Sequence, residues 1–205
     1  MILYRFDVSV YTPFAQIQLS EKDNQLIAMW DDWTSDSKKI GDFTNASVSI
    51  YNVCKRSVYQ ELSSNFKGLI QRELIWEKNP LELKAKNPKR LRWLPVDEPG
   101  DLVAFYTDIA VSALPKSSLS DRVHDGEVIG KNLIGVEERR GRGAGEIIIH
   151  RVENQGIFIS SQDVKETDFF HPVGLGCLLC KPCVKEFVEQ KEYSNVQFLE
   201  YGEIL

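Results

Sequence analysis

Short runs in which apolar and polar residues alternate recur along this chain of 205 residues, and they limit what the chain can fold into. In residues 2–10, which read ILYRFDVSV, every second side chain from Phe6 onward is apolar. A period of two places successive side chains on opposite faces of a strand, so this run predicts a half-buried β-strand. The other runs that predict strands are residues 48–53, 101–112, 129–138, 146–151, 156–160 and 196–201.

The clearest helical period lies in residues 181–193. Val184, Phe187 and Val188 recur at the spacing of one helical face. Pro182 suits the first turn of such a helix, where its missing N–H removes no hydrogen bond. The remaining segments are less regular: residues 25–33 suit a short amphipathic helix or a strand edge, residues 34–45 a loop, and residues 59–77 a mixture of both periods. We therefore expect an α+β fold of mostly antiparallel strands with a few helices.

The length of the chain fits one domain or two small lobes. Prolines interrupt residues 80–99, and Pro99 with Gly100 forms a plausible turn. We expect an N-terminal α+β lobe over residues 1–99 and a C-terminal α+β lobe over residues 100–205, with one continuous domain as the alternative.

Composition excludes several classes of protein. The chain is 42% hydrophobic and 10% aromatic, which is too apolar for a disordered protein. It has no apolar run of about 18 residues, so we expect no membrane span. Lys and Arg total 25 and Asp and Glu total 30, which gives a net charge of −5 and argues against a general nucleic-acid binder. We also see no secretory signal at the N-terminus, and we expect a cytoplasmic protein with reduced cysteines.

One segment has the spacing of metal ligands. His171, Cys177, Cys180 and Cys183 supply the four ligands that a zinc ion prefers, and two residues between cysteines allow both thiolates to bind one ion. The competing interpretation is a short buried strand at Leu178 followed by the helix, with the cysteines as small apolar residues. No separate Cys-x-x-Cys pair lies elsewhere in the chain, so we expect no metal or other cofactor and keep a small zinc-binding protein as an alternative.

Two basic segments could bind an anion. Arg139, Arg140 and Arg142 stand in a glycine-rich connector, where backbone amides and guanidinium groups can surround a phosphate. A strand rather than a helix is expected after it, unlike the usual phosphate-binding loops. The second segment combines an aromatic residue with five basic residues, namely Trp93 with Lys84, Lys86, Lys89, Arg90 and Arg92. Solvated loops explain both segments, and a nucleotide- or nucleic-acid-binding module stays an alternative.

We find no catalytic motif. His124 and Asp125 follow closely on Ser120, but the Gly-x-Ser-x-Gly nucleophile motif is absent. Closeness in sequence does not give the geometry that a nucleophile and a base require. We therefore expect a protein that is not an enzyme.

The string Trp30-Asp31-Asp32-Trp33 is the most unusual candidate for a binding surface. Tryptophan is a common anchor at protein interfaces, and aspartates complement a basic partner. In the competing interpretation the tryptophans form a core pair with solvated acids between them. The residues that we propose for partner binding are Trp30, Asp31, Asp32, Trp33, Arg139, Arg140 and Arg142.

Three strings carry a resemblance to a known family: Gly100-Asp-Leu-Val-Ala-Phe105, the overlapping Phe105-Tyr-Thr-Asp-Ile-Ala-Val-Ser112, and residues 178–204 at the C-terminus. The last of these combines an apolar strand, a Cys cap, an amphipathic helix and a closing strand. This half of the chain resembles the bacterial immunity proteins of polymorphic-toxin systems, and more narrowly the family called immunity protein eleven. The cysteine trio at 177, 180 and 183 departs from the pattern of that family.

The resemblance implies a non-enzymatic inhibitor. Such a protein binds a cognate secreted antibacterial toxin, a type VI or contact-dependent effector, in the cytoplasm and occludes its active site. Many toxins of this kind act on nucleic acids or nucleotides with basic clefts, to which an acidic inhibitor is attracted. The resemblance brings no catalytic residues with it.

Overall fold

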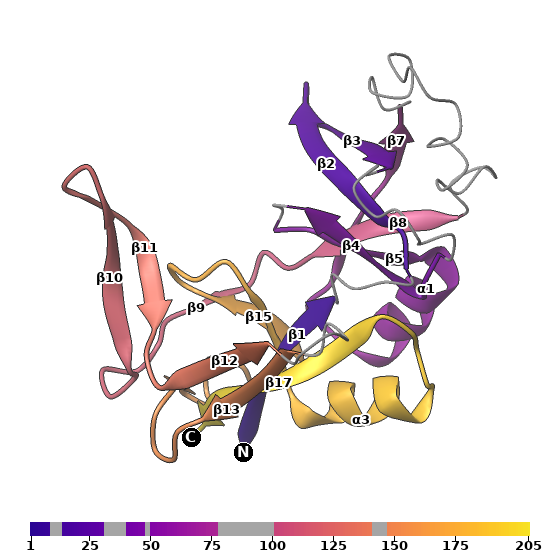
Figure 1. Ribbon diagram of the computed structural model, residues 1–205. Coiled ribbons are helices and arrows are strands. Elements are labelled where there is room, and N and C mark those ends of the chain that lie inside the picture. The colour runs from indigo at the N-terminus through magenta and orange to yellow at the C-terminus, as the bar shows by residue number, and fades with distance from the viewer. Residues whose placement is uncertain (9–13, 31–39, 48–49, 78–100, 141–146) are drawn as a thin grey trace.

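The computed structural model describes residues 1–8, 14–30, 40–47, 50–77, 101–140 and 147–205 (Figure 1). These residues form mostly β-strands, arranged in two large sheets and two hairpins. The helices among them are α1 (Arg56–Asn65) and α3 (Pro182–Gln190). The expected mixture of strands with a few helices is therefore present, with strands predominating.

The first large sheet has six strands and is centred on β1 (Ile2–Val8). β1 pairs antiparallel with β16 on one side and with β17 on the other. The outer pairs, β14 with β17 and β15 with β9, are parallel. The other five strands are β17 (Val196–Ile204), β14 (Ile157–Ile159), β16 (Leu178–Cys180), β15 (Phe169–Pro172) and β9 (Ala110–Val111).

The second large sheet curls into a barrel. Its order is β6-β8-β5-β4-β2-β3-β7. The two end strands, β6 and β7, are separated in the chain by Glu73 alone, so the two edges of the sheet meet. Its seven strands are β2 (Gln16–Lys22), β3 (Gln25–Trp30), β4 (Phe43–Ser47), β5 (Asn52–Lys55), β6 (Ile70–Arg72), β7 (Leu74–Trp76) and β8 (Leu102–Tyr106). The pairs β2–β4 and β3–β7 are parallel, so the expectation of mostly antiparallel sheets is too simple.

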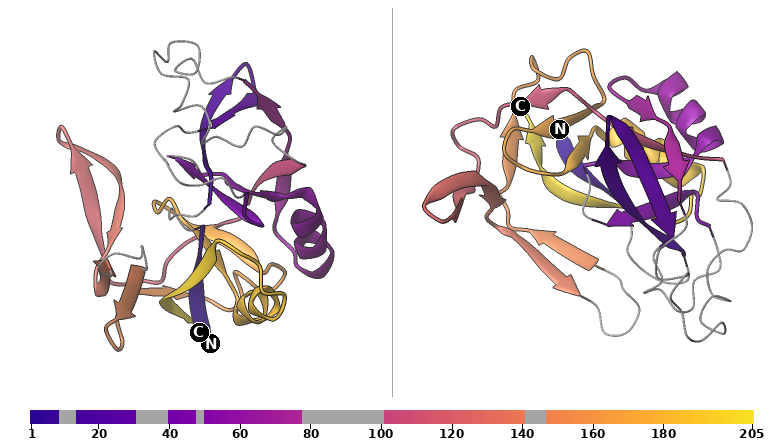
Figure 2. Two further views of the ribbon diagram at one scale, coloured as in Figure 1. Left: turned by 45° about the vertical axis from the view of Figure 1, so that its right-hand side comes forward. Right: turned by 90° about the horizontal axis from the view of Figure 1, so that it is seen from above.

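Two antiparallel hairpins complete the described part of the chain. β10 (Leu119–His124) and β11 (Glu127–Leu133) form a hairpin that we call the arm, and it stands away from the rest of the molecule (Figures 1 and 2). Asp125 and Gly126, both at positive φ, make its two-residue turn. β12 (Val136–Arg140) and β13 (Ile147–Arg151) form the second hairpin.

The largest core lies between the barrel and one face of the six-stranded sheet, where α1 and α3 also pack. Phe6 is at its centre and makes edge-to-face contacts with four other rings at centroid distances of 5.2 to 6.0 Å, those of Phe43, Phe105, Phe169 and Phe198. A second core covers the opposite face of the same sheet, and a third fills the barrel. The barrel and the sheet are thus joined through a continuous aromatic core.

Several expectations for single segments need correction. Residues 25–30 form the strand β3, which is paired on both sides and is neither a helix nor a sheet edge. Residues 43–45, expected at the end of a loop over residues 34–45, belong to β4, because Phe43 is buried in the largest core. The expected boundary at residues 99 and 100 lies outside the described residues. Strand β1 precedes this boundary but pairs in a sheet whose other strands all follow it, and β8 follows the boundary but pairs in a sheet whose other strands all precede it. The helix predicted at 181–193 is confirmed, with bounds Pro182–Gln190.

Candidate functional site

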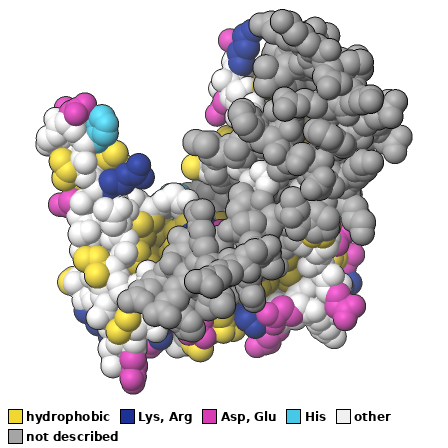
Figure 3. All heavy atoms as spheres, in the orientation of Figure 1, with side chains coloured by type: hydrophobic (Ala, Val, Ile, Leu, Met, Phe, Trp, Pro, Cys, Tyr) yellow, Lys and Arg dark blue, Asp and Glu magenta, His cyan; other side chains and the backbone are white. Residues whose placement is uncertain are grey.

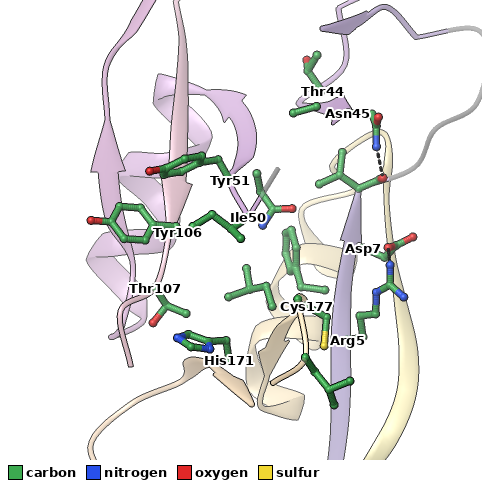
Figure 4. Close-up of a pocket in the computed structure, with 17 residues that line it drawn as sticks. Arg5, Asp7, Thr44, Asn45, Ile50, Tyr51, Tyr106, Thr107, His171 and Cys177 are labelled. Carbon is green, nitrogen blue, oxygen red and sulfur yellow. Dashed lines mark hydrogen bonds and ion pairs between the residues drawn. The ribbon is translucent and has the colours of Figure 1, made fainter. Parts of the chain in front are cut away.

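A cavity of about 330 Å³, which we call the cleft, opens between the six-stranded sheet and the barrel (Figure 4). Its walls come from β1, from β4, from residues 50–52 at the start of β5, from the end of β8, and from β15 with the segment that leads into β16. Phe6 and Leu178 of its lining are buried in the largest core, whereas Ile50 has an exposed apolar side chain there. The cleft therefore lies where strands from both ends of the chain meet.

A closed ion-pair network occupies one side of the cleft. The Arg5 guanidinium donates through Nη2 to Oδ1 of Asp7 at 2.6 Å and through Nη1 to the Tyr201 hydroxyl at 2.9 Å. The other Asp7 oxygen accepts a hydrogen bond from Gln197 at 2.9 Å. Burial lowers the pKa of Arg5, but the neighbouring Asp7 carboxylate and Tyr201 hydroxyl outweigh burial and raise it overall. The two charges of this wall cancel, so the cleft presents no net charge from them.

The opposite side of the cleft carries polar groups that have no internal partner. Within the described residues, the imidazole of His171, the hydroxyl of Tyr106 and the side-chain amide of Asn52 form no hydrogen bonds. Tyr106 packs its ring edge-on against Tyr51 at 5.3 Å between centroids. Thr44, also on the wall, is fully buried, and its hydroxyl has no hydrogen-bond partner in the described part. Of these groups, His171 and Asn52 can donate and accept hydrogen bonds to a molecule in the cleft, whereas the Thr44 hydroxyl is buried and the Tyr106 hydroxyl points away from the other labelled residues (Figure 4).

The cysteines do not form the metal site that their spacing suggested. Residues 178–180 are extended, so Cys177 packs with the core on one face of the sheet while Cys180 lies in the core on the other. Burial raises the pKa of Cys177 to about 12 and raises that of Cys180 well above its usual range. Cys183 is exposed at the start of α3, and His171 and Cys177 line the cleft without a third ligand. No cluster of three or more His, Cys, Asp or Glu side chains suits a metal ion within the described ranges.

Trp30 corrects part of the predicted partner surface. Its side chain is buried in the barrel core and packs on Trp76 with a centroid distance of 5.0 Å. Trp30 is therefore a core residue, as the competing interpretation of this string had it. Asp31, Asp32, Trp33 and Arg142 lie outside the described residues. Arg139 and Arg140 belong to strand β12, and only their backbone is described.

The basic segment at residues 84–92, with Trp93, also lies outside the described residues. His124 sits at the tip of the arm, where its Nδ1 is 3.1 Å from Asp125 and both side chains are exposed. An exposed pair at a hairpin tip has no enclosed space for a substrate. The geometry gives this pair no catalytic arrangement.

The arm is the second feature of the surface that stands out. Its base is anchored because Leu119 and Leu133 pack against the core on the outer face of the six-stranded sheet. Its outer part exposes Val123, Val128 and Ile129 by 57%, 61% and 54%. Val123 and Val128 lie directly opposite each other across the hairpin. Figure 3 shows the surface hollowed between the arm and the body of the molecule.

Most of the groups that meet at the cleft could not be selected from the sequence. Asn52, Tyr106 and His171 come from three strands far apart in the chain, and only His171 attracted attention, for its position near the cysteines. The available signal at Tyr106 was that it ends the continuous buried apolar run of β8.

Within the described ranges, no helix has the length and apolar character needed to cross a membrane. The chain matches no model of a known protein family, and no curated protein sequence matches it significantly. The interpretation of its function rests on its own residues and geometry.

Proposed function

We propose that this chain is an immunity protein, which binds a cognate secreted antibacterial toxin in the cytoplasm of the producing cell and occludes the active site of the toxin. It carries out no reaction of its own in this proposal. The resemblance of residues 100–112 and 178–204 to the immunity protein eleven family supports it. The arm is the structural observation on which it depends.

The arm has the properties of a docking element. A two-stranded hairpin is marginally stable alone, and this one has no neighbouring strand in the described part of the chain beyond its anchored base. Three large apolar side chains near its tip face water. An exposed apolar patch with polar residues around it is typical of a surface that a partner covers. A protruding hairpin of this form can enter a concave active site and block it.

Charge supports the same kind of partner. The net charge of the chain is −5. On the arm, Lys131 is paired with Asp121, whereas Asp125 and Glu127 near the tip form no ion pair with a Lys or Arg in the described residues. An acidic protein associates faster with a basic partner, and such attraction weakens with salt. A toxin with a basic, partly apolar cleft is the partner that this surface fits.

The test is co-expression with the protein encoded beside this gene, followed by gel filtration at 150 mM salt and a growth assay. We expect a one-to-one complex and protection of cells that express the neighbouring protein. The double variant Val123→Asp with Val128→Asp should weaken the complex at least tenfold, because it places two carboxylates on the apolar face of the arm.

Ile75→Asp is the matched control, since Ile75 is an exposed apolar residue of the barrel strand β7, away from the arm. It should leave the affinity unchanged. Absence of both co-elution and protection would refute the proposal. Salt-sensitive binding of a single-stranded oligonucleotide without any protein complex would instead favour a nucleic-acid-binding module.

A further inference from the structure

The cleft has the size of a site for one side chain. Its volume of about 330 Å³ is at the lower end of the range of about 300 to 1,000 Å³ that holds small ligands. Ile50, whose side chain is 69% accessible, belongs to its lining. A ring in the cleft can contact the exposed side chain of Ile50 and the partly buried side chain of Leu175.

The chemistry of the cleft is that of an amphipathic aromatic group. Ile50 and Leu175 offer apolar contact to the face of a ring, while His171 and Asn52 offer hydrogen bonds that no described residue uses. Tyrosine and tryptophan side chains combine a large apolar body with one polar group and are enriched among the anchors of interfaces. Among the described residues of the lining, Arg5 and Asp7 are the only charged pair, and they neutralise each other, so a charged ligand would find no counterion there.

We propose that the cleft receives a tyrosine or tryptophan side chain of the partner protein. This inference rests on the proposed function, and it assigns to the cleft a role separate from that of the arm. The polar atom of the inserted ring hydrogen-bonds to His171 or Asn52, and the ring packs on Ile50 and Leu175. The arm and the cleft would then hold the partner at two separate points.

Gly176 provides a variant that changes the lining of the cleft. It lines the cavity, and a Cβ atom added to it would meet no other atom within 4 Å. Its φ is not in the positive range, so a side chain strains no backbone there. Gly176→Leu should therefore fold normally and place an apolar side chain at the cavity. Val173→Leu is the control, because Val173 is exposed in the same segment but does not line the cleft.

The first measurement uses free probes and is independent of the toxin. N-acetyl-tryptophanamide and N-acetyl-tyrosinamide are titrated into ¹⁵N-labelled protein, with N-acetyl-leucinamide as the probe that lacks a ring. We expect saturable shifts of the amides of Thr107, His171 and Gly176 with the two aromatic probes only. Gly176→Leu should weaken this binding at least fivefold, and Val173→Leu should leave it unchanged. Equal shifts with all three probes, or no shifts at the cleft, would overturn the inference.

The second measurement separates this inference from the proposed function. If the neighbouring protein binds the wild-type chain, Gly176→Leu should reduce its affinity at least tenfold while the arm residues stay intact. Unchanged affinity would overturn the inference and leave the immunity function standing. Probe binding without any effect of Gly176→Leu on the complex would identify the cleft as a small-molecule site, and that also overturns the inference. Failure of the wild-type chain to bind the neighbouring protein would overturn both proposals.

Discussion

A single carboxylate connects the barrel to the turn before β17, and its removal should weaken the whole fold. Asp42 precedes β4 and accepts hydrogen bonds from the backbone N–H and the hydroxyl of Ser194 at 2.9 and 2.8 Å. Lys55 donates a third at 2.9 Å. A hydrogen bond to a charged group contributes about 1.5 to 3 kcal/mol, while a partly exposed ion pair contributes about 0.2 to 1 kcal/mol. Since Asp42 is itself partly exposed, we expect Asp42→Ala to lower the free energy of unfolding by about 3 kcal/mol.

The same carboxylate should give the loss a pH dependence. Burial raises the pKa of Asp42, but the hydrogen bonds from Ser194 and Lys55 outweigh burial and lower it overall. A pKa that is lower in the folded state than in the unfolded state means that stabilisation is complete above the unfolded pKa of about 3.9. It is lost as the pH falls through the folded pKa. The difference between wild type and Asp42→Ala should therefore be constant from pH 5 to pH 8 and shrink below pH 4.

Urea unfolding followed by tryptophan fluorescence measures this effect, because Trp30 and Trp76 report on the barrel. Ser194→Ala keeps the backbone N–H donor to the carboxylate but removes the hydroxyl, which also accepts a hydrogen bond from the backbone N–H of Asp42 at 2.9 Å, and it should cost about 2 kcal/mol. Lys55→Met removes only the ion pair and should cost less than about 1 kcal/mol. A loss below about 1 kcal/mol for Asp42→Ala at pH 7, or a loss that is equal at pH 7 and pH 3, would refute the reasoning.

Three further outcomes follow from packing and burial. Gly202→Ala should prevent normal pairing of β14 with β17, because the added Cβ would overlap the backbone carbonyl of Ile157. Circular dichroism and solubility should both show the loss of structure. The control Gly176→Ala should keep a free energy of unfolding within about 0.5 kcal/mol of wild type. Phe6→Ala should cost about 3 to 5 kcal/mol in urea unfolding, and a loss below about 1.5 kcal/mol would contradict its central place in the aromatic core. Iodoacetamide at pH 8 should label Cys183 first in the folded protein and all four thiols after unfolding, as mass spectrometry can count. Cys183 is exposed, whereas Cys54 and Cys180 are buried and Cys177 is partly buried. Burial raises the pKa of all four thiols, so the labelling of Cys183 should itself be slow.

The sequence predicted those elements in which local pattern and tertiary position agree. The alternation in residues 2–8 produced β1 because the six-stranded sheet buries Phe6 and Val8 on one face. The helical spacing near the C-terminus produced α3 because Val184 and Val188 face the same core. In each case one face of the element is buried and the period alone identifies it.

The errors have a common cause in the closure of the barrel. Helix α1 was missed because most of it falls in residues 59–77, a segment of mixed period. The helix buries only Val58 and Leu62, and no side chain caps its N-terminus. β4 was missed because four of its five residues are polar or small, and its pairing with β5 and β2 supplies what its side chains lack. Such long-range pairing has no signature in a short window of sequence.

The candidate site was the least predictable part. The zinc hypothesis used spacing alone. In a turn, two cysteines at this spacing could bind one ion, but residues 178–180 form an extended strand, so Cys177 and Cys180 lie on opposite faces of the sheet. The tryptophan hypothesis assumed that the side chain of Trp30 is exposed. Its exposure depends on which face of β3 lies toward the barrel core, and Trp30 lies on that face. The cleft depends on a contact between two sheets, and a single sequence does not show which strands lie opposite each other.

The position of β1 has a consequence for synthesis in the cell. Its neighbours are strands that the ribosome makes long after it, since Phe6 pairs with Leu178 on one side and with Phe198 on the other. The barrel strands β2–β8 are all translated by residue 106, so that half can form first while both edges of β1 stay open. Closing such long loops is slow, and an open strand attracts other chains. The nascent polypeptide should therefore depend on chaperones until β16 and β17 have emerged.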